Sequence, residues 1–68
     1  MDEYYLEFVR TDRGVSEKET FWVADYKAAE EYARERCRHA AAWKVTHVDR
    51  LGAERIVAWD LVGSVKAY

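Results

Sequence analysis

The fold of this chain is decided by residues 25–39, which read DYKAAEEYARERCRH. The run is rich in strong helix formers, with alanines set among paired glutamates and arginines. Asp25 stands immediately before it, where a short acidic side chain can accept a hydrogen bond from a free backbone amide of the first turn. We therefore predict a helix from Tyr26 to about His39, with Asp25 as its N-cap.

One face of this predicted helix consists of small side chains. Ala29, Ala33 and Cys37 follow one another at four-residue spacing, and Tyr26 and Ala40 fall on the adjoining positions. Small side chains let a helix approach its supporting layer closely, so we expect this face to be the inner one. A lone cysteine in such a row is typical of an inert core thiol.

The outer face of the helix is expected to carry ion pairs. Glu30 lies four residues before Arg34, and Glu35 lies three and four residues before Arg38 and His39. Exposed pairs at these spacings stabilise a helix by roughly 0.2–0.5 kcal/mol each. They contribute more to solubility than to the stability of the fold.

Two strands are predicted before the helix. Residues 4–10 alternate between an inner and an outer set, Tyr4, Leu6 and Phe8 against Tyr5, Glu7 and Val9. A turn is expected at residues 11–14, because Gly14 can adopt a positive φ without steric cost. Residues 15–18 are expected as a ragged loop or an exposed strand start, and the second strand becomes clear at residues 19–24. There Phe21 and Val23 point one way, and Thr20 and Trp22 the other.

Two more strands are predicted after the helix. Residues 43–50 are rich in β-branched and aromatic side chains, but their inner face could be Trp43, Val45 and His47 or Thr46 and Val48. A bulge would bring both valines to the core. After a turn at residues 51–54, residues 55–62 form a nearly continuous apolar run that favours a central strand. Residues 65–68 are compatible with a short fifth strand or with loose packing.

Together these elements predict a single domain spanning residues 1–68. The expected fold is α+β, in two layers: a four-stranded, largely antiparallel sheet in the order β-β-α-β-β, with the helix packed on one face. A chain of this size buries only about 60% of the surface that its unfolded form exposes. The sequence leaves nothing to cover the second face of the sheet, where Tyr5, Val9 and Trp22 are expected. An aromatic face of this kind predicts a partner, either another protein or a second copy.

The charge distribution is uneven and argues against nucleic acid. The chain has 11 basic and 13 acidic residues, a net charge of −2. Residues 1–35 hold ten acids and five bases (net −5), whereas residues 36–68 hold three acids and six bases (net +3). Nucleic-acid-binding domains usually carry a basic excess. We expect no direct nucleic-acid binding, although a two-signed surface can orient a protein partner.

Enzymatic and metal-binding chemistry is not indicated. Cys37, His39 and His47 do not have the spacing of a closed zinc site, and the three glycines are isolated turn residues rather than a phosphate-binding loop. Asp60 lacks a second carboxylate in an apolar cleft. We expect no catalytic residue, no metal and no cofactor.

Membrane and secretory roles are not indicated either. The acidic N-terminus lacks the basic character of a signal peptide, and no stretch approaches about 18 uncharged apolar residues. With one cysteine no intramolecular disulfide can form, so a reducing cytoplasm is the expected compartment.

Residues 33–39 and 43–48 resemble the helix end and third strand of a family of small phage-encoded anti-CRISPR proteins that act on type I surveillance complexes. Element order matches over most of the chain, and residue matches include Cys37, His39 and Val48. The resemblance implies a non-catalytic protein in a host bacterial cytoplasm, which docks on a Cas subunit and obstructs target DNA engagement.

The leading hypothesis is therefore a protein-binding inhibitor of type I CRISPR interference. Two alternatives are a small structural or regulatory module that forms a homodimer through the uncovered sheet face, and a small nucleic-acid-binding domain. The candidate partner-binding residues are aromatic residues of the strands and arginines of the helix: Tyr5, Trp22, Arg34, Arg38, Trp43 and Trp59.

Overall fold

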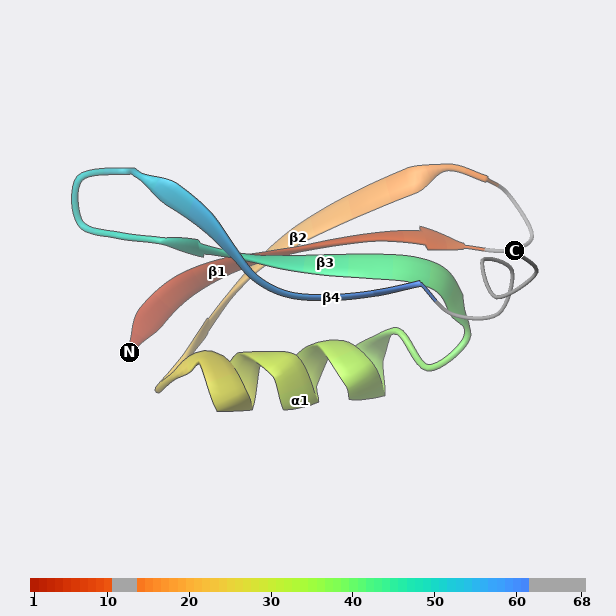
Figure 1. Cartoon of the computed structure of the whole chain (residues 1–68), viewed down its shortest axis with the longest axis horizontal. Helices are drawn as coiled ribbons and strands as arrows, with labels where there is room; N and C mark the ends of the chain where they lie inside the picture. Colours follow the sequence, from red (N-terminus) through yellow and green to blue (C-terminus); the bar gives the residue numbers. More distant parts are fainter. Residues whose placement is uncertain (11–13, 62–68) are drawn as a thin grey trace.

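The fold is a four-stranded sheet with a helix against one face (Figure 1). The computed structural model describes residues 1–10 and 14–61. Its elements are β1 (Asp2–Arg10), β2 (Ser16–Val23), α1 (Tyr26–Arg36), β3 (Ala40–Val48) and β4 (Glu54–Leu61). The strands lie in the order β2-β1-β3-β4, and every neighbouring pair is antiparallel. The predicted two-layer α+β fold with the order β-β-α-β-β is confirmed.

Helix α1 begins as predicted and ends earlier. Asp25 has an extended backbone and its carboxylate accepts a hydrogen bond of 2.9 Å from the Ala28 amide, so it is the N-cap. The helix ends at Arg36 rather than near His39, with Cys37 as its C-cap. Residues 40–42 pair with the end of β1, and this pairing outweighs the helix propensity of the three alanines.

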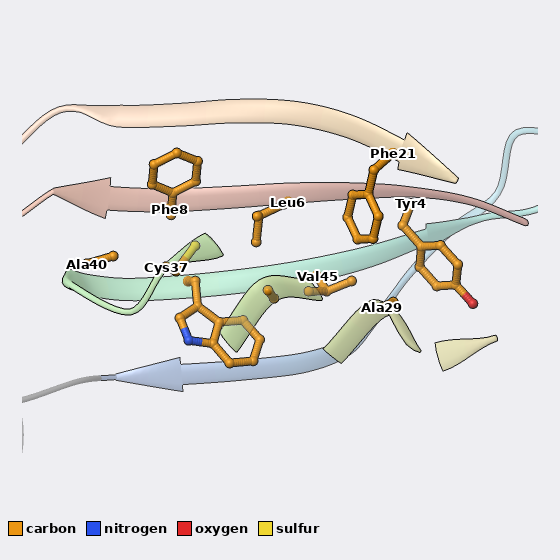
Figure 2. Close-up of a cluster of buried hydrophobic side chains, with 10 residues drawn as sticks. Tyr4, Leu6, Phe8, Phe21, Ala29, Cys37, Ala40 and Val45 are labelled. Atoms are coloured by element: carbon orange, nitrogen blue, oxygen red, sulfur yellow. The ribbon is translucent and has the colours of Figure 1, made fainter. Parts of the chain in front are cut away.

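The core lies between α1 and the sheet (Figure 2). It consists of small side chains from the helix and larger ones from the strands: Tyr4, Leu6, Phe8, Phe21, Ala29, Ala33, Cys37, Ala40, Trp43 and Val45. The row Ala29, Ala33 and Cys37 is buried in this core, which confirms that the face of small side chains is the inner face of the helix.

Tyr26 does not belong to the inner face, contrary to expectation. It is the first residue of α1 and 58% exposed, because the contact between helix and sheet begins one turn later at Ala29. Tyr32 is the helical aromatic that reaches the sheet. Its ring stacks on that of Phe21, with a centroid separation of 4.2 Å.

The inner face of β3 is set by its pairing with β1. Trp43 lies opposite Phe8 and Val45 lies opposite Leu6, so both face the helix and are buried. His47 follows on the same face. The prediction that a bulge brings both valines of this strand to the core is wrong, because Val48 lies on the opposite face and is half-buried.

Strand β4 lies at an edge of the sheet, so the prediction of a central position is wrong. Ala58 pairs with Val45 and Ile56 pairs with Thr46, which leaves Val57 as the extra residue of a bulge. Val57 and Ala58 both pack against the core. The continuous apolar run of this strand therefore reflects a local bulge and not burial on both faces.

Several boundaries also differ from expectation. Strand β2 starts at Ser16, which confirms the exposed strand start, because Glu17 and Lys18 pair in register with the second half of β1. Strand β3 runs from Ala40 to Val48 rather than over residues 43–50. Gly14 has the expected positive φ of 65°. Residues 11–13 of the predicted turn and the suggested fifth strand at residues 65–68 lie outside the described residues.

Candidate functional site

The candidate site is the face of the sheet opposite α1, which we call the open face. Within residues 1–10 and 14–61 no element packs over it (Figure 1). Strand pairing and side-chain alternation assign to it Glu3, Tyr5, Glu7, Val9, Ser16, Lys18, Thr20, Trp22, Ala42, Lys44, Thr46, Val48, Glu54, Ile56 and Trp59.

The middle of the open face carries charges of alternating sign. Glu7 of β1 is paired in register with Lys18 of β2 on one side and with Lys44 of β3 on the other. The Lys44 ammonium lies 3.6 Å from the Glu7 carboxylate. The Lys18 ammonium lies 4.0 Å from the centroid of the Tyr5 ring, in a cation–π arrangement. The centre is thus polar and internally paired, which the expectation of a uniformly aromatic face did not include.

Large apolar side chains occupy the two edge strands of the open face. Trp22 of β2 is 58% exposed, and Ile56 and Trp59 of β4 are 53% and 65% exposed. A hollow of about 660 Å³ lies beside Trp59 and Ile56, lined also by Val9 and Ala42. Aromatic side chains are enriched at protein-binding surfaces, where they act as anchors, so Trp22 and Trp59 are the candidate anchors of this face.

Only some of the six predicted site residues lie together. Tyr5, Trp22 and Trp59 are on the open face, whereas Trp43 is 4% exposed and belongs to the core on the helix-covered side. Trp43 pairs with Phe8, and that pairing places its ring under α1. It is therefore not available to a partner in the folded chain.

The two predicted arginines lie away from the open face, Arg34 on α1 and Arg38 just beyond the end of this helix. Arg34 forms an ion pair of 2.8 Å with Glu30 and one of 3.4 Å with Asp60, and its guanidinium lies 5.5 Å from the Trp43 ring centroid. Arg38 pairs with Glu35 at 2.7 Å. Both predicted helical ion pairs are confirmed, and neither arginine is free to serve the open face.

The basic residues near the helix end are neutralised by neighbouring acids. Besides Arg34 and Arg38, Arg36 lies 3.2 Å from Glu19 of β2, and Arg10 is ion-paired with Glu17. Backbone recognition of nucleic acid depends on cations that replace the counterions of phosphate. Because carboxylates already neutralise these arginines, the cluster has little capacity to replace the counterions of phosphate.

Nucleophilic chemistry is disfavoured at the one thiol. Cys37 is buried, and burial raises its pKa from an ordinary value of 9.0 to about 11, since desolvation disfavours the thiolate. The His47 ring is tilted against that of Tyr4, with 5.1 Å between the centroids, and its Nε2 lies 3.9 Å from the Asp2 carboxylate. Among the described residues, no group of three or more histidine, cysteine or acidic side chains is arranged to hold a metal ion.

Ile56, Glu7 and Lys44 belong to the open face and are not among the residues predicted for the site. Alternation in residues 4–10 does place Glu7 on the outer side. Ile56 could not be assigned, because strict alternation puts it on the face opposite Trp59, and only the bulge at Val57 brings the two together.

Helix α1 spans 11 residues, and nowhere in the described ranges is there a helix long and apolar enough to cross a membrane. Comparisons of the chain with protein-family models, with curated proteins and with solved structures found no match.

Proposed function

We propose that this chain is a non-catalytic docking protein that binds another protein through the open face of its sheet. The observation that carries the proposal is the exposure of Trp22, Ile56 and Trp59 on a face that no described element covers. A small domain gains little from leaving two tryptophan side chains in water, and such anchors contribute most of the binding energy at protein interfaces.

The polar centre of the open face supports a protein partner over a lipid or a nucleic acid. Glu7, Lys18 and Lys44 present both signs within one row, and paired charges of this kind orient a protein partner more than they add affinity. A lipid surface favours cationic residues beside apolar ones, without the glutamates of this face. The row of Glu7, Lys18 and Lys44 therefore favours a protein partner whose surface carries complementary charges.

We further propose that the partner is a Cas subunit of a type I CRISPR surveillance complex, and that docking obstructs its engagement of target DNA. This step rests on the resemblance in residues 33–39 and 43–48. On this proposal the protein acts in a bacterial cytoplasm. Val48, one of the matched residues, lies on the open face.

The test is a target-DNA binding assay with purified type I surveillance complexes of the common subtypes. Excess protein should abolish DNA binding for at least one subtype. Trp22→Ala should weaken inhibition, whereas Tyr26→Ala should not, because Tyr26 is equally exposed at 58% but lies on the helix. Undiminished DNA binding in every subtype would remove the surveillance complex as partner. If Tyr26→Ala weakened inhibition and Trp22→Ala did not, the open face would be the wrong surface.

A further inference from the structure

The two edges of the sheet are unequal. On β2 the consecutive residues Glu17, Lys18 and Glu19 put charges along the edge, and two of them are tied by ion pairs to Arg10 and Arg36. On β4 the run from Ile56 to Trp59 carries no charge. Natural sheets defend their edges with charged side chains, since unpaired backbone groups there can pair with another strand. Of the two edges, β4 is the less protected.

The side chains of β4 are self-complementary about the point between Val57 and Ala58. If a second β4 ran antiparallel to the first about that point, Arg55 would lie opposite Asp60 and Ile56 opposite Trp59, each pair occurring twice by symmetry. Arg55 and Asp60 pair with His47 and Trp43 of β3, so both lie on the helix side. Ile56 and Trp59 both lie on the open face.

The bulge makes this register the consistent one. In a regular strand, residues an odd number of positions apart point to opposite faces, so Ile56 could not stand beside Trp59 of an antiparallel copy. The extra residue Val57 shifts the alternation of side chains along β4 by one position. As a result, the two members of each opposed pair between Arg55 and Asp60 point to the same face of the joined sheet. Shifting the register by one residue in either direction would set Ile56 against an inward-facing residue, Ala58 or Asp60.

Charge also favours a second copy. Arg55 has no ion pair among the described residues, while Asp60 has a single one, at 3.4 Å to Arg34. Antiparallel pairing of two β4 strands brings each Arg55 to an Asp60, and opposite charges directly across a strand pair are stabilising. We propose that the outer edge of β4 pairs with the same edge of a second copy of this chain, so that two four-stranded sheets join into one of eight strands.

This assembly leaves both open faces uncovered on the same side of the joined sheet. It therefore goes beyond the proposed docking function and does not depend on it. The dimer would present two open faces at once. A partner with two copies of the binding site could then contact both, and the first contact would raise the effective concentration of the second.

The test is sedimentation equilibrium of the full chain over a range of concentrations, combined with a charge-reversal cycle. Wild type should be a dimer. Arg55→Asp should raise the dissociation constant about tenfold or more, since two attractive pairs become two repulsive ones. Adding Asp60→Arg to that variant should restore the dimer, and the rescue excludes a folding defect as the cause. Trp22→Ala, on the opposite edge strand, should leave the dimer intact.

Three results would overturn the proposal. The first is a wild-type monomer up to the solubility limit. The second is a dimer that Arg55→Asp leaves unchanged or that the double reversal fails to restore. The third is a dimer that Trp22→Ala dissociates, which would place self-association on the open face instead.

Discussion

The ring of Phe21 on β2 stacks on the ring of Tyr32 on α1 at 4.2 Å between centroids and an interplanar angle of 17°. Phe21 is buried, and its ring also stacks on that of Tyr4, with 5.7 Å between the centroids. The Tyr32 hydroxyl donates a hydrogen bond to Glu19, also of β2. This pair of rings is the main aromatic link between an edge strand and a helix whose inner face is otherwise built from alanine and cysteine.

Replacing Phe21 by alanine should lower the free energy of unfolding by about 3–5 kcal/mol, because it removes a buried ring and leaves a cavity that alanines of the helix cannot fill. Urea denaturation followed by circular dichroism measures the change. Tyr32→Phe is the matched control: it keeps the stack and loses only the hydroxyl bond to Glu19, at a cost of about 1 kcal/mol. Equal losses for the two variants would mean that the stack itself contributes little.

Trp22→Ala should separate association from folding. Since this side chain is more than half exposed, its truncation should change the free energy of unfolding by less than about 1 kcal/mol, while binding to a protein partner weakens. Thermal unfolding and a partner-binding assay on the same preparation give both quantities. A variant that no longer folds would show that Trp22 is a packing residue and that the assigned faces of β2 are reversed.

Asp25→Ala should destabilise the protein by about 1 kcal/mol through loss of the N-cap bond to the Ala28 amide. Asp25→Asn retains an acceptor oxygen and should cost much less. Chemical denaturation of the three proteins measures the series. If asparagine were as damaging as alanine, the carboxylate charge rather than the hydrogen bond would be the stabilising feature.

Stability should fall at alkaline pH, in part through Cys37. Its pKa is about 11 in the folded chain against an ordinary 9.0, so the unfolded chain loses this proton first. The stabilisation is fully present below pH 9 and is lost as pH rises toward 11. Burial likewise raises the pKa of Tyr4 above its ordinary 10.0, and the hydrogen bond to Glu19 raises the pKa of Tyr32. Each tyrosine therefore adds stability that is fully present below pH 10 and is lost as the pH rises further.

The Cys37 contribution can be isolated by measuring unfolding free energy against pH for wild type and Cys37→Ala. The variant should be less stable at neutral pH because a cavity is formed, but its stability should fall less steeply between pH 9 and 11. In wild type the thiol should also resist a thiol-specific reagent until urea unfolds the chain. Rapid modification of the folded protein at neutral pH would contradict both the burial and the raised pKa.

Local patterns in the sequence determined the elements and most of their inner faces. The alternation of Tyr4, Leu6 and Phe8 and the four-residue spacing of Ala29, Ala33 and Cys37 follow from the periods of a strand and a helix, which neighbouring residues alone establish. The cap at Asp25 is equally local. These features suffice for the α+β class and for an uncovered sheet face that includes Tyr5 and Trp22.

The tertiary structure alone decided which strands are neighbours and where the bulge of β4 falls. Strand β4 is apolar enough for a central position, yet β1 and β3 occupy the centre, because strand order depends on contacts between residues distant in sequence. Pairing with β3 leaves Val57 unpaired, and that single residue sends Ile56 to the open face beside Trp59. Trp43 was assigned to the core in the same way, by its pairing with Phe8. Register is a property of two strands at once, so no period within one strand can reveal it.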